Sequence, residues 1–68
     1  MSSKKELPKE IISRRAVLGI TQEQLSSLSG VGIKTIYKLE QGLGNPSLDT
    51  LEKVLDVLGL ELNIKLKK

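Results

Sequence analysis

The sequence of 68 residues contains no cysteine, histidine, tryptophan or phenylalanine, and it has a single tyrosine. Without cysteine the chain cannot form disulfides, and without cysteine or histidine it lacks the usual soft metal ligands. The same absences remove the commonest general base and the commonest strong nucleophile, and no glycine-rich phosphate loop is present. We therefore expect no enzymatic activity, no cofactor and no metal.

Long apolar runs are also missing. No stretch of about 18 apolar residues could cross a bilayer, and the polar start MSSKKELPKE lacks the apolar core of a secretory leader. The lack of cysteine agrees with a reducing compartment. We expect a cytoplasmic protein without a membrane partner.

The chain is short, and its formal net charge of +3 is unevenly placed. A domain of this size has a thin core, so oligomerisation is the expected support. Lysines and arginines crowd the two ends, whereas Asp49, Glu52 and Asp56 gather on the last helical pattern. This asymmetry favours a basic face turned toward a polyanion, although an ordinary solvated surface would give the same total.

The first nineteen residues predict a tail followed by a helix. Residues 1–5 read as a flexible basic tail, and Pro8 suits the first turn of a helix, where its missing N–H costs nothing. Gly19 would end this helix. Its expected apolar side consists of Leu7, Ile11, Ala16 and Leu18.

The stretch 21–42 predicts two short helices joined by a tight turn. Thr21 and Gln24 form a capping box at the start of the first, and Ile20 and Leu25 can form the accompanying hydrophobic staple. Three glycines set the boundaries of these helices. Gly30 would end the first helix, Gly32 would allow the second to start, and Gly42 would end the second. This spacing indicates a helix-turn-helix, within a domain expected over residues 6–60. Leu25, Leu28, Ile36 and Leu39 are its expected core positions.

A fourth helix is expected after the turn-rich loop 42–46. Ser47 can cap it, Asp49 suits its first turn, and Asp49 with Lys53 makes an i,i+4 pair. Gly59 would end it. The predicted apolar side consists of Leu48, Leu51, Leu55 and Leu58, broadened by Val54 and Val57.

In the last residues the spacing of apolar side chains changes from a helical one to an alternating one. Apolar side chains alternate with polar ones from residue 60 onward, which predicts a β-strand. No second strand-like segment is present, so the economical partner is the same strand of another copy across a two-fold axis. A frayed tail that packs on its own body is the alternative. We assign residues 61–68 to a dimerisation strand whose apolar residues are Leu60, Leu62, Ile64 and Leu66.

The second helix of the motif, residues 33–41, carries the candidate DNA contacts. With Ile36 and Leu39 facing the core, Lys34 and Lys38 point outward and repel each other unless an anion lies opposite. Ile33 near the helix start could meet a thymine methyl. Tyr37 could contact a phosphate or sugar, or it could pack on a neighbouring helix, and the lysines could serve solubility alone.

Phosphate contacts usually come from helix N-termini and small polar side chains. Gln22 lies at the first position of its predicted helix. Thr35, Gln41 and Asn45 lie where a flanking backbone could pass, although each could instead serve a cap or turn.

Arg15 and Glu40 are expected to pair. Arg15 falls near the apolar side of the first helix, and Glu40 follows Leu39 near the end of the third. A hydrogen-bonded ion pair there would hold the recognition helix to the scaffold, with a net stability limited by desolvation.

The segments TQEQL, GVG, IYKLEQG and NPSLDTL together resemble the XRE, or lambda-repressor-like (Cro and repressor type), helix-turn-helix family. The resemblance runs from Arg15 to about Leu60. It implies an all-α domain of four to five helices. It also implies phosphate contacts by Gln22 and Gln41, and the buried Arg15–Glu40 pair.

Base contacts implied by the resemblance fall on Gly32, Ile33, Lys34 and Lys38. Gly32 and Ile33 replace residues that are polar in much of the family, and neither has a side chain that could hydrogen-bond a base. Ser26 and Ser29 stand where alanine-like residues are commoner.

The ending LGLELNIKLKK is similar to the HipB-type antitoxin branch. The sequence thus predicts a dimeric transcriptional regulator, most simply a repressor, bound to a pseudo-palindromic double-stranded DNA operator. One alternative is an antitoxin that also binds a toxin protein, with Ile12 and Val17 as candidate contacts. Another is a protein-interaction module that never binds DNA.

Overall fold

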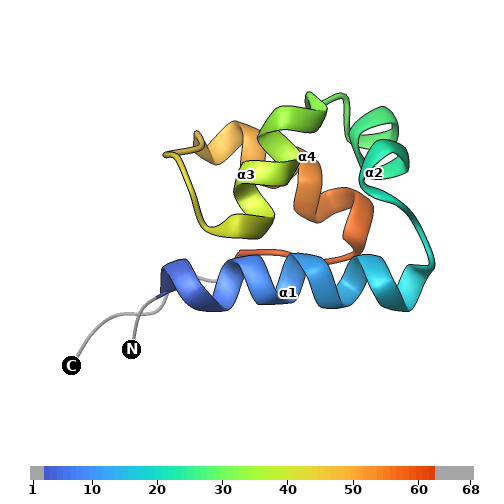
Figure 1. Cartoon of the computed structure of the whole chain (residues 1–68), viewed down its shortest axis with the longest axis horizontal. Coiled ribbons are helices and arrows are strands. Elements are labelled where there is room, and N and C mark those ends of the chain that lie inside the picture. Colours follow the sequence, from blue (N-terminus) through green and yellow to red (C-terminus); the bar gives the residue numbers. More distant parts are fainter. Residues whose placement is uncertain (1–2, 63–68) are drawn as a thin grey trace.

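The computed structural model describes residues 3–62, with side chains from residue 6 onward. Its four helices are α1 (Ser3–Leu18), α2 (Gln22–Ser29), α3 (Ile33–Gln41) and α4 (Leu48–Leu58). The long α1 lies along one side of the molecule, where α3 and α4 pack against it, and α2 packs against α3 and α4 (Figure 1). The described part of the chain contains helices and no strand, as expected for an all-α domain.

The helix boundaries follow from local capping. The Gln24 amide donates to the Thr21 hydroxyl oxygen at 3.0 Å, and the Gln24 side-chain oxygen accepts from the Thr21 amide at 2.8 Å, so the capping box is confirmed. The Ser47 hydroxyl oxygen likewise accepts from the Thr50 amide at 3.1 Å and caps α4. Gly30 ends α2 with φ of +75°, a left-handed conformation that glycine adopts without steric cost.

The turn between α2 and α3 is held by two serines. The Ser26 hydroxyl donates to the Val31 carbonyl oxygen at 2.6 Å, and the Val31 amide donates to the Ser29 hydroxyl oxygen at 3.2 Å. Alanine at either position could not make these bonds. The polar residues that set this chain apart from the family pattern therefore stabilise the turn.

All four helices contribute to one apolar core. Its centre is fully enclosed, because Ile11, Leu25, Ile36, Val54 and Leu58 have no exposed surface. Val31, in the turn, is also buried, although the helical periodicity did not single it out. The remaining buried members are Leu39 and Leu55, with Leu7, Ile20, Leu51, Val57 and Leu60 packed around them.

The start of α1 differs from the prediction. The helix begins at Ser3, so part of the stretch 1–5 that was expected to be a tail is helical, and Pro8 lies inside the helix and not in its first turn. Lysine and glutamate are good helix formers, which favours extending the helix toward the N-terminus. The proline removes one backbone hydrogen bond from that first part.

Four apolar residues expected in the core are exposed instead. Ala16 lies five positions after the buried Ile11, which places it on another side of α1. Leu18, Leu28 and Leu48 are 44%, 65% and 58% exposed. Each of these leucines lies within two residues of a helix end, where few neighbouring elements remain to cover it.

The chain after α4 turns back along α1 (Figure 1). Arg14 holds this return, because its Nε donates to the Leu58 carbonyl oxygen at 3.0 Å. Leu60 packs against the core of the domain, and Leu62 is 42% exposed. Residues 60–62 have no regular secondary structure, and the rest of the expected strand, including Ile64 and Leu66, lies outside the described residues.

No helix in the described range is both long and apolar enough to traverse a bilayer.

Candidate nucleic-acid interface

The recognition helix α3 is fixed by one side and exposed along the other. Ile36 is completely buried, and Leu39 and Glu40 are 4% and 6% exposed. These three residues recur at the spacing of one helical face. The opposite side of α3 therefore projects from the body of the protein.

The exposed side of α3 carries most of the predicted DNA contacts. Gly32, Lys34, Lys38 and Gln41 are exposed, and Ile33 and Tyr37 are 42% and 52% exposed. Neither lysine forms an ion pair with a described carboxylate. Of the two alternatives for Tyr37, the structure supports a position on the outer face and not one packed in the core.

The loop after α3 borders this face. Asn45 is exposed and shares a small hollow with Thr35, which is half-buried, and with the side chain of Lys38. The Lys38 side chain passes the backbone of Gly44, where an added Cβ would lie 3.7 Å from the lysine Cδ. The structure therefore brings Thr35 and Asn45 together beside the end of the recognition helix.

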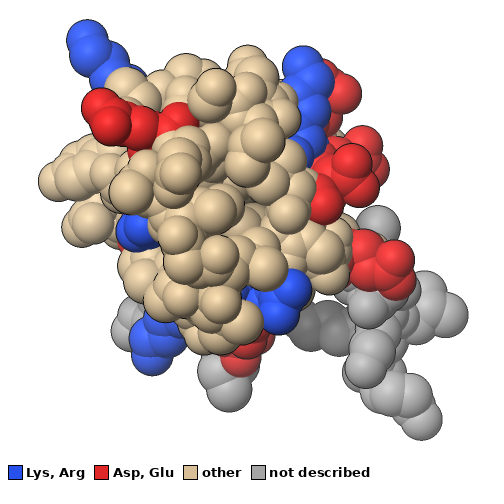
Figure 2. Space-filling model, turned by 90° about the vertical axis from the view of Figure 1, so that its right-hand side faces the viewer, with Lys and Arg blue, Asp and Glu red and all other residues tan. Residues whose placement is uncertain are grey.

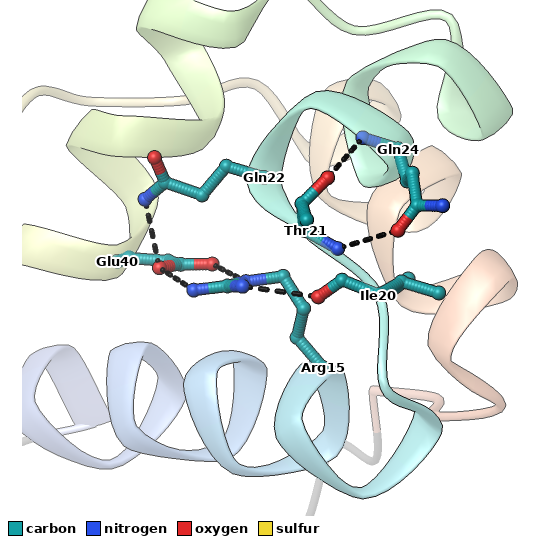
Figure 3. Close-up of polar contacts among 6 residues, drawn as sticks. All are labelled: Arg15, Ile20, Thr21, Gln22, Gln24 and Glu40. Atoms are coloured by element: carbon teal, nitrogen blue, oxygen red, sulfur yellow. Dashed lines mark hydrogen bonds and ion pairs between the residues drawn. The ribbon is translucent and has the colours of Figure 1, made fainter.

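A buried ion pair connects α3 to α1, as predicted. The Arg15 guanidinium donates from Nε to Glu40 Oε2 at 2.7 Å and from Nη2 to Glu40 Oε1 at 3.0 Å (Figure 3). Its third bond runs from Nη1 to the Ile20 carbonyl oxygen at 3.0 Å. The Glu40 side chain is 3% exposed and that of Arg15 is 22% exposed.

Gln22 completes this network from α2. Its side-chain Nε2 donates to Glu40 Oε1 at 3.0 Å, so both oxygens of the carboxylate are satisfied and α1, α2 and α3 meet at one group (Figure 3). One hydrogen of the Gln22 amide remains for another acceptor. The predicted phosphate contact and this structural bond are therefore compatible.

The surroundings of Glu40 determine its protonation. Burial alone would raise the pKa of Glu40, but the hydrogen bonds from Arg15 and Gln22, together with the positive charge of Arg15, outweigh it and lower that pKa below its ordinary value. The hydrogen bond to Glu40 raises the pKa of Arg15, against the opposing effect of burial. The pair is therefore ionised at neutral pH.

The sequence did not identify one residue and one contact of this region. Leu43 was treated as loop, yet it is 55% exposed and lies beside Ile33, Tyr37 and Lys38. The available signal in the sequence was that Leu43 is an apolar residue directly after Gly42, the glycine that ends α3. The Gln22–Glu40 bond joins residues 18 positions apart, and no local pattern indicates it.

Charge is unevenly spread over the surface. The end of the molecule formed by the last turns of α1 and by α2 is largely uncharged, and acidic side chains gather along one of its edges (Figure 2). The acids of α4 are exposed, namely Asp49, Glu52 and Asp56. Among the described side chains, no group of three or more acidic residues is arranged to hold a metal ion.

Two short helices at this spacing, with a buried anchor and an exposed outer face on the second, form a helix-turn-helix. A family model described as "Helix-turn-helix" matches residues 11–64, which is most of the chain. The chain belongs to this helix-turn-helix family. The match includes all of α2, α3 and α4 and confirms the resemblance seen in the sequence.

Two proteins are similar to this helix-turn-helix chain over most of its length. A protein of Haemophilus influenzae is 50% identical over 58 residues, which are 85% of this chain and 59% of that protein. A protein of Methanothermobacter thermautotrophicus is 41% identical over 51 residues, 75% of this chain and 74% of that protein. Each is described as an uncharacterized HTH-type transcriptional regulator. The chain thus spans about three fifths of the Haemophilus relative's length.

Proposed function

We propose that this protein is a DNA-binding transcriptional regulator that inserts α3 into the major groove of double-stranded DNA. The outer face of α3 carries the proposal, because it exposes Lys34 and Lys38 while Ile36, Leu39 and Glu40 hold the helix in place. An α-helix of this kind fits the width of the groove. The descriptions of both relatives support the same function.

Phosphate contacts flank the inserted helix in this proposal. The N-terminus of α2 supplies backbone N–H groups that the Thr21 cap leaves free, and Gln22 retains one side-chain hydrogen. Gln41 and Asn45 border the C-terminal end of α3, and Thr35 lies in its first turn beside the same hollow as Asn45, so all three could contact a flanking phosphate backbone. Base-edge contacts fall to Ile33, Lys34 and Lys38, with the exposed Gly32 backbone beside them.

A two-fold dimer would bind two half-sites about one helical turn, ~34 Å, apart on a pseudo-palindrome. The proposed interface uses the C-terminal segment 61–68, paired antiparallel with its copy. The exposed Leu62 supports an apolar contact there, whereas Leu60 already packs within its own subunit. Binding over a promoter would repress transcription by occlusion, and this DNA partner implies a cytoplasmic location.

Selection from a random-sequence duplex library, followed by footprinting of the recovered duplexes, tests DNA binding. The proposed function predicts recovery of a common pseudo-palindromic sequence. Lys38→Ala should weaken binding to it by about 5- to 150-fold, which corresponds to ~1–3 kcal/mol for a base contact. Lys53→Ala is the matched control, since Lys53 is an exposed lysine on α4. The proposed docking would be contradicted if the protein bound all duplexes with equal affinity, or if Lys38→Ala and Lys53→Ala lost the same amount of affinity.

A second proposal adds a toxin protein as partner. Val17 is 70% exposed, Ile12 is 41% exposed, and Leu28 on α2 is 65% exposed. Exposed apolar side chains of this kind are typical of a protein-contact surface when they cluster. Co-purification of this chain with the product of a neighbouring gene, lost in Val17→Asp, would support the antitoxin function.

A further inference from the structure

The surface of α4 and the chain that follows it form a groove of about 470 Å³. Its floor is apolar, because Leu55, Leu60 and Leu62 line it. Leu55 is 2% exposed, Leu60 is half-buried and Leu62 is 42% exposed. Every described lining residue belongs to α4 or to the chain after it, so a partner can occupy the groove while the outer face of α3 stays free.

Carboxylates form the rim of this groove. Asp49, Glu52 and Asp56 recur at the spacing of one face of α4, and all three are exposed. Glu61 adds a fourth exposed carboxylate from the chain beyond α4. Lys53 pairs with Asp49 at 3.5 Å, and the other three carboxylates form no ion pair with a described basic side chain. Like charges on one helix face repel each other, and a cation between them removes that repulsion. The groove therefore fits a partner that is both apolar and positively charged.

A segment with this composition is present in the chain itself. Residues 63–68 read NIKLKK, so three lysines alternate with or follow two aliphatic residues. Six residues of extended chain span about 20 Å, and α4, with 11 residues, is about 16 Å long. The segment thus complements the groove in charge and in apolar content, and it is long enough to follow α4.

A second copy of the chain can present this segment more directly than the same copy can. Residue 63 follows Glu61 and Leu62, which are themselves part of the groove, so the segment would have to reverse direction at once to enter its own groove. In the antiparallel pairing proposed above, the end of one segment lies beside the start of its copy. With Ile64 on the two-fold axis, Lys67 of the second copy lies opposite Glu61, on the same face of the pair.

We propose that the groove of each subunit binds the lysine-rich residues 63–68 of the other subunit, so that a two-fold dimer contains two such contacts. The inference rests on the dimer of the proposed function and names the surface that receives the segment. Glu52, Asp56 and Glu61 attract the lysines, and the apolar floor takes up the aliphatic side chains. Because exposed charges supply much of the attraction, the dimer dissociates more readily as the salt concentration rises.

Charge exchange between two variants tests this contact. The groove variant combines Glu52→Lys with Asp56→Lys, and the end variant combines Lys67→Glu with Lys68→Glu. Each variant alone sets like charges against each other in both contacts. A single exposed ion pair changes affinity by only a few-fold, but several are reversed here at once, so each variant should dimerise about ten-fold more weakly or worse in analytical ultracentrifugation. An equimolar mixture of the two should form a heterodimer as tight as the unaltered dimer, because each groove then meets a segment of opposite charge.

The control variant combines Glu10→Lys with Glu23→Lys. Both carboxylates are exposed, on α1 and α2, and the change in net charge equals that of the groove variant. This control should dimerise like the unaltered chain, and with the end variant it should form no heterodimer as tight as the one formed by the groove variant. Circular dichroism checks that each variant is folded. The end variant changes no residue of the described core, so it tests the contact even if the groove variant fails to fold.

Two results would overturn the inference. One is a groove variant that dimerises as tightly as the unaltered chain, as expected if residues 63–68 pack on their own subunit or pair without touching α4. The other is a mixture of the groove and end variants that forms no heterodimer. In both cases the unaltered chain is still a dimer. A monomeric unaltered chain would instead refute the proposed dimer and this contact together.

Discussion

Arg15 of α1 donates two hydrogen bonds to the carboxylate of Glu40 on α3, at 2.7 and 3.0 Å. A third bond to the same carboxylate comes from Gln22 on α2. The recognition helix is therefore linked to both preceding helices through a single buried carboxylate. Such an arrangement fixes the orientation of α3 better than apolar contacts alone, because hydrogen bonds are directional.

Removal of one partner of this pair should be costly. Arg15→Ala leaves the Glu40 carboxylate buried without its guanidinium, and we expect the free energy of unfolding to fall by about 2–4 kcal/mol. The double variant Arg15→Met with Glu40→Leu should lose less than Arg15→Ala alone. Urea denaturation followed by circular dichroism measures both. Lys53→Ala, which breaks the exposed Asp49–Lys53 pair, is the control and should change stability by no more than about 0.5 kcal/mol. A double variant less stable than the single one would refute this account.

Stability should depend on pH through Glu40. Its pKa is lowered in the folded protein, so its stabilisation is fully present above the unfolded pKa of about 4.3 and is lost as pH falls through the folded pKa. Between about pH 5 and pH 2 the unaltered protein should therefore lose more stability than Glu40→Gln. Denaturation midpoints of both proteins are measured across this range. Because the two proteins share all other carboxylates, the difference between their midpoints reports on Glu40 alone. A curve for Glu40→Gln that runs parallel to that of the unaltered protein would contradict the prediction.

The two glycines of the turn should respond oppositely to the same substitution. Gly30 has φ of +75°, so Gly30→Ser should lower stability by about 1 kcal/mol through backbone strain. Gly32 precedes α3 with φ of −59°, has open space around it and makes no side-chain cap bond. Gly32→Ser should therefore leave stability unchanged or raise it by a few tenths of a kcal/mol. Thermal denaturation compares them, and equal losses would show that the space in the turn and not the dihedral angle matters.

DNA affinity should fall steeply with salt. If a dimer neutralises about six to ten phosphates, the logarithm of the association constant should fall with the logarithm of salt concentration with a slope of about −5 to −9. Fluorescence anisotropy with the selected duplex, at several potassium chloride concentrations, gives this slope. Lys38→Ala should leave the slope unchanged if Lys38 contacts a base and reduce it by about one if it contacts a phosphate. A slope near zero would argue against groove docking.

The dimer proposal predicts that the C-terminal segment is required for self-association. A variant ending at Leu60 should sediment as a monomer, and the 68-residue chain as a dimer, at the same concentration. Its helical circular dichroism should be retained, since the central core lies within residues 11–58. A truncated protein that remains dimeric would assign the interface to the helices.

Local features of the fold were predictable. The capping box at Thr21, the cap at Ser47 and the glycines that end the helices all depend on residues within four positions of each other, and each was found where expected. The outward position of Lys34 and Lys38 followed from the helical period once Ile36 and Leu39 were assigned to the core. The Arg15–Glu40 pair was also predicted, because the two residues lie next to the apolar sides of their helices.

Tertiary packing decided the rest. Leu18, Leu28 and Leu48 carry the right period but lie at helix ends, and whether such a position is covered depends on how far the neighbouring helices extend. Gln22 meets Glu40 only because α2 and α3 cross at this point. Leu43 lies beside the recognition face because the chain turns back over the end of α3. Contacts of this kind depend on the relative placement of whole helices, and the spacing of residues along the chain does not specify it.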